Sequence, residues 1–314
     1  MTTAADPRGA GPGRVAGGAR VLVVANPTAG GYRAERVAAL VSACRSLGLR
    51  AEARLTTGPG DLGRIAADPE LAADVLVVAG GDGSVNEAAA GLLRRAGPRP
   101  ALAVLPSGTA NVLAAELSLP RRPAEVAAAV AGGRTLPLWP GLANARPFLL
   151  MASAGFDAEV VHAVDPAAKR RWKKLAFVAT AFGRGFRGGR PDLHVTADGE
   201  RLTGRLAIVT KAARYGGPHV LVRAANVTRP GLHLVLVLTD RPVALMRLGL
   251  ALLAGRVRPG PAVEIRAVRR VTLEADGPVP VPVQIDGEAF GTTPVTIEEA
   301  AECLRILVPP GPTP

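Results

Sequence analysis

The sequence has few aromatic residues, few cysteines and no long hydrophobic run. Aromatic residues make up 3% of its 314 residues, so Ala, Leu and Val must supply most of any core. Its two cysteines, Cys44 and Cys303, cannot form a disulfide framework, and its four histidines show no metal-ligand spacing. These absences predict a reduced, cytosolic protein without a zinc site.

The lack of a long apolar run also argues against membrane crossing. The longest candidate, residues 242–255, is shorter than the roughly 18 residues that a spanning helix needs, and it contains Arg247. The first 18 residues have no apolar core, so we expect a disordered tail rather than a secretory signal.

Basic residues outnumber acidic ones by 38 to 26, which gives a net charge of +12 and a pI near 11.1. Such a balance suggests an anionic partner, either nucleic acid, nucleotide phosphate or an anionic membrane surface. Nearly all of the basic residues are arginine, and a bias in genome composition would explain that equally well. Charge alone therefore does not choose among these partners.

Strand-like and helix-like segments alternate in the first half of the sequence. Strands are expected at residues 19–25, 50–56, 74–80 and 101–106, and a helical stretch follows each of them. This alternation predicts an α/β domain, with a parallel sheet covered by helices on both faces. In such sheets ligands bind at the carboxyl ends of the strands.

From about Thr135 the pattern changes to short β-like runs separated by turn residues, which predicts a mainly antiparallel second domain. One helical interruption is expected at residues 166–184. We expect a tail at residues 1–18, the α/β domain at 19–134 and the β-rich domain at 135–297. The strand-like run 303–308 could return to the first domain, which residues 298–310 would then complete.

Four glycine-rich turns fall at the carboxyl ends of the predicted parallel strands. They are "NPTAGG" (26–31), "TTGPGD" (56–61), "GGDGSVN" (80–86) and "PSGTAN" (106–111). Glycines let backbone amides approach a phosphate, and a following helix N-terminus adds donors. One such turn is usually structural, but four along one sheet edge favour a phosphate cradle. The sequence contains neither a Walker A motif nor a Rossmann G-x-G-x-x-G motif.

Six segments resemble, in order, the motifs of the diacylglycerol kinase catalytic-domain family, which includes bacterial soluble lipid kinases and sphingosine and ceramide kinases. They are "NPTAGG" (26–31), "GGDGSVNE" (80–87), "LPSGTANVLAAEL" (105–117), "SAGFDAEVV" (153–161), "YGGPHVL" (215–221) and "IDGE" (285–288). The resemblance covers residues 19–308. It implies a nucleotide-binding α/β domain, a C-terminal β-sandwich and a cleft between them. It also implies phosphorylation of a lipid hydroxyl with ATP and Mg²⁺, the lipid being diacylglycerol or a related lipid alcohol.

The resemblance assigns the ATP site to the first domain. The residues that would contact the nucleotide are Asn26, Pro27, Thr28, Ala29 and Gly30 at the phosphates, Thr57 near the nucleoside, Gly80, Gly81, Asp82, Gly83, Ser84, Val85 and Asn86 around the phosphates, and Gly108 and Thr109 completing the cradle. Asp82 would link to Mg²⁺ or to its waters, because Mg²⁺ is usually held by carboxylates and phosphate oxygens. The structural alternative for Asp82 is a turn residue that bonds the nearby backbone.

A second pair of carboxylates, Asp286 and Glu288, follows the strand-like run "VPVQI". In an extended chain, residues two apart point to the same side, so both carboxylates could face one ligand. The alternative is a β-turn with Asp-Gly at its tip. The resemblance assigns this segment to the active site, with Glu288 as the base that accepts the hydroxyl proton and Asp286 orienting it or Mg²⁺. The opposite assignment, with Asp286 as the base, stays open.

The sequence departs from the family pattern at several positions. Val112 stands where many relatives have an aspartate, and Arg33 is the only candidate for a lysine found after the first turn in some relatives. Some bacterial members hold a structural Mg²⁺ through aspartates in a loop that here reads "NVTRPGLHL" (226–234). Because this loop contains Arg229 and Pro230 and no carboxylate, we predict that this accessory metal site is absent.

The segment 169–190 carries eight basic residues and no acidic one, with Trp172, Phe177, Phe182 and Phe186 between them. A basic stretch with aromatic residues is typical of binding to an anionic bilayer, which predicts a cytoplasmic protein peripheral to the inner membrane surface. A solvated charged face with inward aromatics is the alternative. No recognition helix, stacking platform or zinc module indicates nucleic acid as a partner.

Two other functions compete with lipid phosphorylation. An NAD kinase would share the fold and a GGDG turn, although "PSGTAN" and "IDGE" suit the lipid kinases better. A nucleotide-binding, membrane-associated protein that has lost turnover would explain the departures, although Asp82, Asp286 and Glu288 all remain. No pattern in the sequence indicates an oligomeric state.

Overall fold

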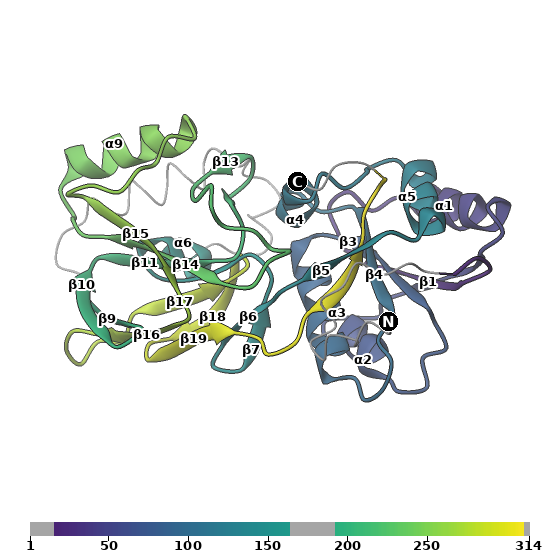
Figure 1. Ribbon diagram of the computed structural model, residues 1–314, viewed down its shortest axis with the longest axis horizontal. Helices are drawn as coiled ribbons and strands as arrows, with labels where there is room; N and C mark the ends of the chain where they lie inside the picture. The colour runs from purple at the N-terminus through teal and green to yellow at the C-terminus, as the bar shows by residue number, and fades with distance from the viewer. Residues whose placement is uncertain (1–15, 164–191, 311–314) are drawn as a thin grey trace, which may run out of the picture. The chain divides into compact units, whose positions relative to one another are not determined.

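The computed structural model describes residues 16–163 and 192–310. The chain divides into two compact units, Met1–Trp139 with Ala301–Pro314 and Pro140–Ala300 (Figure 1). Each unit has a hydrophobic core of its own.

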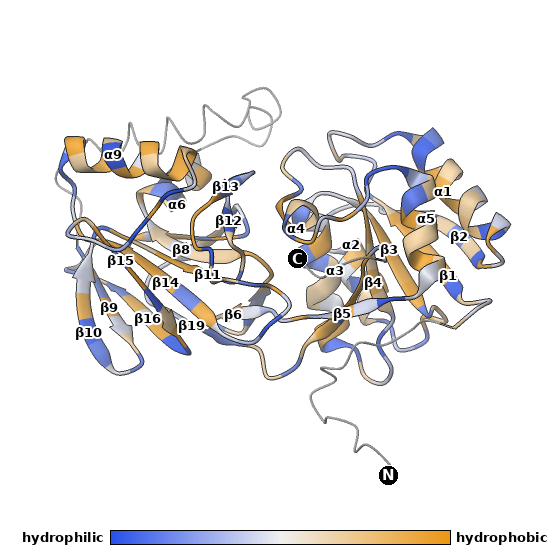
Figure 2. Cartoon of the chain, turned by 45° about the horizontal axis from the view of Figure 1, so that its top comes forward, coloured by the Kyte–Doolittle hydropathy of each residue, from blue (hydrophilic) through white to orange (hydrophobic). Residues whose placement is uncertain are grey.

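The first unit is built on a six-stranded sheet with the order β2-β1-β3-β4-β20-β5. Its strands are β1 (Arg20–Ala25), β2 (Arg50–Leu55), β3 (Val75–Gly80), β4 (Ala101–Pro106), β5 (Thr135–Leu138) and β20 (Leu304–Leu307). All neighbours pair in parallel except β5, which is antiparallel to β20. The strands β3 and β4 are buried along their whole length, and Figure 2 shows them as hydrophobic runs, as expected for a parallel sheet that is covered on both faces.

Five helices cover this sheet. They are α1 (Ala34–Ser46), α2 (Asp61–Ala67), α3 (Asp82–Arg94), α4 (Val112–Glu116) and α5 (Pro123–Gly132). The helices α1 and α5 pack together against one face, and α2 packs against α3 on the other (Figure 1). The predicted α/β domain is thus confirmed. Strand β5, which the sequence pattern assigned to the second domain, instead forms the edge of this sheet, because its backbone pairs with β20.

The second unit consists mainly of two antiparallel sheets, which confirms the predicted β-rich domain. One has the order β10-β9-β16-β19-β6-β7, and the other has the order β15-β14-β11-β8-β17-β18. Their bounds are β6 (Gly141–Ala143), β7 (Arg146–Phe148), β8 (Met151–Gly155), β9 (Leu193–Ala197), β10 (Glu200–Gly204), β11 (Leu206–Thr210), β14 (Leu232–Val237), β15 (Val263–Val268), β16 (Arg270–Ala275), β17 (Pro282–Ile285), β18 (Glu288–Thr292) and β19 (Val295–Glu299). Side chains from both sheets form one core, so the unit is a β-sandwich. A short hairpin of β12 (Arg214–Tyr215) and β13 (His219–Val220) stands apart.

The second unit also contains helices that the sequence pattern did not predict. They are α6 (Phe156–Ala163) and α9 (Pro242–Leu253). In α9 apolar residues surround almost the whole helix, so the segment shows little of the 3.6-residue alternation that identifies a surface helix. The helix expected at residues 166–184 lies outside the described residues. Within residues 16–163 and 192–310, no helix has both the length and the hydropathy that crossing a membrane requires.

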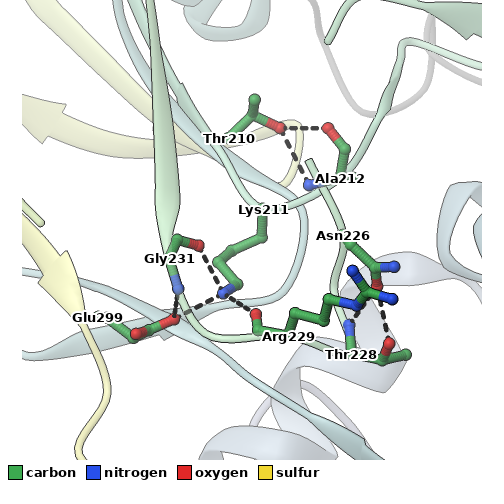
Figure 3. Close-up of polar contacts among 8 residues, drawn as sticks. All are labelled: Thr210, Lys211, Ala212, Asn226, Thr228, Arg229, Gly231 and Glu299. Carbon is green, nitrogen blue, oxygen red and sulfur yellow. Dashed lines mark hydrogen bonds and ion pairs between the residues drawn. The ribbon is translucent and has the colours of Figure 1, made fainter. Parts of the chain in front are cut away.

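A buried lysine fastens one loop of the second unit. The ammonium of Lys211, whose side chain is 0% exposed, donates hydrogen bonds to the carbonyls of Arg229 (2.8 Å) and Gly231 (2.7 Å) and to Oε1 of Glu299 (2.7 Å) (Figure 3). The same Oε1 accepts the N–H of Gly231 at 2.6 Å. Burial lowers the pKa of Lys211, and the contact with Glu299 opposes that shift. Three oxygens match the three ammonium hydrogens, so this cation ties the loop before β14 to the end of β19.

We predict that Lys211→Met lowers the free energy of unfolding by about 3 kcal/mol, because it leaves the half-buried carboxylate of Glu299 and the carbonyls of Arg229 and Gly231 without the cation that binds them. Chemical denaturation monitored by circular dichroism measures the change. The double variant Lys211→Met/Glu299→Gln is the matched control. It should recover part of the loss, since a glutamine oxygen can still accept the Gly231 N–H without carrying a charge. Equal stability of Lys211→Met and the wild type would contradict this role.

Candidate active site

Three glycine-rich loops of the first unit meet at the carboxyl edge of its sheet. They follow β1, β3 and β4. The strand order reverses between β1 and β3, because β2 is added on one side of β1 and β3 on the other, and ligands bind at such a point in sheets of this kind. The N–H of Gly31 donates to the carbonyl of Ser107 at 2.8 Å, which joins the first loop to the third. The Nδ2 of Asn26 donates to Oγ of Ser84 at 3.2 Å, which joins the first loop to the second.

The loops approach so closely that larger residues would not fit. A Cβ atom added to Gly108 would lie 2.4 Å from Cα of Gly81, and one added to Gly31 would lie 2.8 Å from the carbonyl oxygen of Ser107. A Cβ at Gly80 would lie 2.5 Å from Cβ of Ser84. The glycines in these motifs are therefore needed to bring the backbones of three turns into contact.

Small polar side chains surround this contact. Asn26 organises the first loop, because its Oδ1 accepts the N–H of Thr28 at 2.9 Å and its hydroxyl at 2.8 Å. Pro27, Thr28 and Gly30 are exposed in the same loop, with Ala29 half-buried. The hydroxyl of Thr109, from the third loop, would lie 3.6 Å from a Cβ atom at Gly30. The sequence-predicted residues 26–30, 80–84, 108 and 109 are thus brought together.

Other predicted residues take different positions. The side chain of Val85 is buried and its N–H donates to the carbonyl of Gly81, so Val85 shapes the turn without offering a donor. Asn86 is also buried, and its Oδ1 has no hydrogen-bond partner among the described residues. Thr57 follows β2 and donates from both its N–H (2.9 Å) and its hydroxyl (3.1 Å) to Asp61. Those two hydrogen bonds hold the pKa of Asp61 below its usual value, the backbone bond having the larger effect.

Asp82 holds the second loop to the third. It is the first residue of α3, and its Oδ2 and Oδ1 accept the N–H groups of Val112 (3.0 Å) and Leu113 (3.1 Å) at the start of α4. A carboxylate at a helix N-terminus satisfies free N–H groups and faces the positive end of the helix dipole. Burial nevertheless raises the pKa of Asp82, and the backbone hydrogen bonds oppose that shift. Asp82 therefore has a structural role wider than that of a turn residue, because its carboxylate joins the start of α3 to the start of α4.

The donor set of these loops fits a phosphate. Backbone N–H groups at the start of α3, the hydroxyls of Ser84 and Thr109, and glycines that let the backbones of the turns approach closely are all features of anion sites. The carboxylate of Asp82 accepts the N–H groups of Val112 and Leu113, and its negative charge could also attract a cation or a water bound to that cation. No group of three or more His, Cys, Asp or Glu able to hold a metal occurs in residues 16–163 and 192–310.

In the second unit, Asp286 and Gly287 form the tip of the hairpin between β17 and β18. Both have positive φ, 48° and 80°, as a two-residue hairpin turn requires. The expectation that an extended chain places Asp286 and Glu288 on one side is therefore wrong, because the chain reverses direction between them. The carboxylate of Asp286 accepts the N–H groups of Leu149 (2.7 Å), Leu150 (2.9 Å) and Met151 (2.9 Å).

Glu288 lies just beyond this turn, at the start of β18. Its side chain is 51% exposed and lies 3.8 Å from the guanidinium of Arg146. The same guanidinium lies over the ring of Phe290, 5.6 Å from its centroid. Glu288 is thus open to a ligand from solvent, whereas Asp286 is committed to the backbone of the segment before β8.

A buried polar network supports the hairpin turn, and the sequence analysis missed it. Asp157 in α6 accepts hydrogen bonds from the hydroxyls of Ser153 (2.6 Å) and Tyr215 (3.1 Å). Gln284 donates to Ser153 at 2.7 Å, and its Oε1 accepts the N–H of Gly287 at 2.8 Å. Burial raises the pKa of Asp157 despite these bonds. The signal was the carboxylate of Asp157 directly after the small and apolar residues "SAGF", because an aspartate is rarely buried without partners.

The loop for which we predict no accessory metal is the loop held by Lys211. The carbonyls of Arg229 and Gly231 and the carboxylate of Glu299 already surround its ammonium. An internal cation there supplies a physical reason for the prediction.

Comparisons with known proteins agree with this architecture. Residues 20–141 match the diacylglycerol kinase catalytic domain, and residues 151–308 match the YegS C-terminal NAD kinase beta sandwich-like domain. A Pseudomonas aeruginosa (strain UCBPP-PA14) protein named "Probable lipid kinase YegS-like" is 32% identical over 88% of this chain and 91% of its own length. A Bacillus subtilis (strain 168) protein named "Diacylglycerol kinase" is 31% identical over 50% of this chain and 53% of its own length.

Solved structures share the fold. A Bacillus anthracis str. Sterne protein superposes with a TM-score of 0.78 at 22% identity, over 93% of this chain and 97% of that chain. A diacylglycerol kinase from the same organism superposes with a TM-score of 0.69 at 18% identity, over the same shares of the two chains. At these identities the likeness shows the fold alone. The matches to both domains and the relative along most of the chain show more: this chain belongs to the family of lipid kinases that contains the YegS-like proteins and the diacylglycerol kinases.

Proposed function

We propose that this protein transfers the γ-phosphoryl group of ATP to the hydroxyl of diacylglycerol or of a related lipid alcohol. The observation that carries the proposal is the meeting of three glycine-rich loops at one sheet edge, with Gly81 and Gly108 in backbone contact. Membership in a lipid kinase family favours the phosphates of ATP as the anion that these loops bind. The loops around Asn26, Ser84 and Thr109 would hold the phosphates through N–H groups and hydroxyls.

Charge control in this site would rest on Asp82. Mg²⁺, when bound, would neutralise the charge of the transferring group, as phosphoryl transfer generally requires. Asp82 would hold the ion or one of its waters through its carboxylate, which also accepts the N–H groups of Val112 and Leu113. Its hydrogen bonds to α4 fix the carboxylate in place before any ligand arrives.

Glu288 would act as the base. As the substrate O–H bond breaks, its proton would pass to the carboxylate of Glu288, the oxygen would bond to the γ-phosphorus, and the bond from that phosphorus to ADP would break. Its 51% exposed side chain can reach a ligand, whereas the three backbone hydrogen bonds of Asp286 suit a residue that positions the turn. We therefore assign positioning to Asp286 and proton transfer to Glu288.

A lipid substrate implies work at a membrane surface. We propose a cytoplasmic protein peripheral to the inner membrane, where ATP and the lipid are both present. The basic segment 169–190, predicted to contact an anionic bilayer, lies outside the described residues.

A transfer assay tests the function directly. With radiolabelled ATP and Mg²⁺, we expect label on diacylglycerol or another lipid alcohol in mixed micelles, and none on NAD or without lipid. Transfer to NAD but to no lipid would favour an NAD kinase. Nucleotide binding without transfer to any acceptor would favour a protein that has lost turnover.

We predict that Asp82→Asn lowers turnover by at least about 100-fold, because it removes the charge that should organise Mg²⁺. The loss of charge at the start of α4 should cost only about 1 kcal/mol of stability. Steady-state kinetics and thermal unfolding separate the two effects. Asp74→Asn is the matched control. Asp74 lies directly before β3, at the end of the strand away from Asp82, and it accepts the N–H of Arg20 at 2.8 Å. Because it lies at the opposite edge of the sheet, its substitution should leave turnover unchanged. Near-normal turnover of Asp82→Asn would show that the carboxylate only holds the loops together.

We predict that Glu288→Gln lowers turnover by at least about 100-fold while ATP still binds, because an amide cannot accept the hydroxyl proton. Calorimetric titration with ATP and steady-state kinetics measure the two quantities. Glu298→Gln is the matched control, because Glu298 is a 44% exposed glutamate paired with Arg270 on another strand. Its turnover should equal that of the wild type.

A second Asp-Gly hairpin turn provides the control that shows whether Asp286 does more than shape its own turn. Asp198, with φ of 49°, begins the Asp-Gly turn between β9 and β10 and accepts the N–H groups of Arg269 and Arg270. Asp286→Asn and Asp198→Asn should both destabilise the unit, but only Asp286→Asn should also lower turnover. A fully active Glu288→Gln together with an inactive Asp286→Asn would move the base to Asp286.

A further inference from the structure

One face of α9 exposes a row of large apolar side chains. Val243, Met246, Leu250 and Leu253 are 56%, 52%, 61% and 44% exposed. Their spacing of three, four and three residues places them on the same side of a helix, and Figure 2 shows hydrophobic residues along most of α9. Half of the large apolar residues that are exposed in residues 16–163 and 192–310 lie on this one helix, so they form a patch rather than scattered exposures.

A neighbouring side of the helix already holds it to the protein. Leu245, Gly249 and Leu252 are the buried residues of α9. The exposed row is therefore not needed to keep the helix in place, and its contact with water costs free energy that burial against a partner would recover.

Four arginines lie in or next to α9 in the sequence, without any acidic residue between them. Arg241, Arg247, Arg256 and Arg258 are exposed, and residues 241–263 contain no aspartate or glutamate. An apolar helix face with a basic border is typical of helices that lie in the interface of an anionic bilayer. A second copy of the chain is less suited to this face, because two such borders would bring like charges together.

We propose that α9 docks on an anionic lipid bilayer, with Val243, Met246, Leu250 and Leu253 inserted among the lipids and the four arginines at the phosphate level. The helix is too short to cross a bilayer, so it would lie along the surface. The proposal rests on the proposed function in one respect: docking would bring the enzyme to a substrate that stays in the membrane.

Vesicle sedimentation tests the apolar row. The wild type is mixed with vesicles of phosphatidylglycerol and phosphatidylcholine, and bound protein is measured as a function of lipid concentration. We expect Leu250→Glu to weaken binding by at least about tenfold, because it places a charge where an apolar side chain should be buried. Val279→Glu is the matched control. Val279 is exposed to the same 61% but lies outside α9, and its variant should bind as the wild type does.

The arginines are tested with the variant Arg241→Gln/Arg247→Gln/Arg256→Gln/Arg258→Gln. Its binding should fall by at least about tenfold at low salt, and the difference should shrink at high salt because the attraction is screened. Binding of the wild type to vesicles of phosphatidylcholine alone should be correspondingly weaker. All substituted side chains are exposed, so thermal unfolding should remain close to that of the wild type.

Equal vesicle binding by Leu250→Glu and the wild type would overturn the proposal. A dimer in light scattering that Leu250→Glu dissociates, with vesicle binding unchanged, would overturn it in favour of a second copy. Turnover of a water-soluble short-chain diacylglycerol should be the same in Leu250→Glu and the wild type. If the wild type phosphorylates no lipid but binds vesicles through α9, the proposed function fails while the docking surface stands.

Discussion

The backbone contact between Gly81 and Gly108 is the constraint on which the first unit's site depends. It is reached only because β3 and β4 are parallel neighbours whose carboxyl ends lie at one edge of the sheet. A single added Cβ at Gly108 would lie 2.4 Å from the Cα of Gly81, so the two turns could not stay in contact. The hydrogen bonds of Asn26 and Gly31 then bring the loop after β1 against the same point. The three turns thereby bring their backbone N–H groups to one edge of the sheet.

The carboxylates of Asp82 and Asp286 both accept hydrogen bonds from backbone N–H groups. Asp82 caps α4 and Asp286 binds three consecutive N–H groups, so each links segments that are distant in sequence. These hydrogen bonds fix each carboxylate in position, so little rearrangement of the carboxylate would be needed during a reaction. The fixed position also limits what it can do: the lone pairs of Asp286 are largely used, whereas Glu288 keeps an exposed carboxylate. The division of roles that we propose between Asp286 and Glu288 rests on this difference in hydrogen bonding.

The second unit combines a rigid interior with an unusual surface. Inside, hydrogen bonds of the Lys211 ammonium fix the loop before β14, and those of the Asp157 network fix the hairpin turn at Gly287. Outside, α9 presents apolar side chains to solvent. A family that acts on lipids gives that exposure a physical reason, because a bilayer can bury the apolar row while the arginines remain at its charged surface.

The sequence by itself determined what depends on local pattern. Apolar runs at βαβ spacing predicted the parallel sheet, and the glycines after each strand predicted turns at one edge, because both signals lie within a few residues of the structure they specify. Tertiary structure decided the rest. The strand β5 pairs with β20 from the far end of the chain, and Lys211 finds oxygens at Arg229, Gly231 and Glu299. The sequence left open whether Asp286 lies in a turn or in an extended chain. The structure shows a left-handed backbone at Asp286, whose carboxylate accepts the N–H groups of residues 149–151. These contacts join residues far apart in the chain, so the free energy that fixes them appears only when the fold brings those residues together.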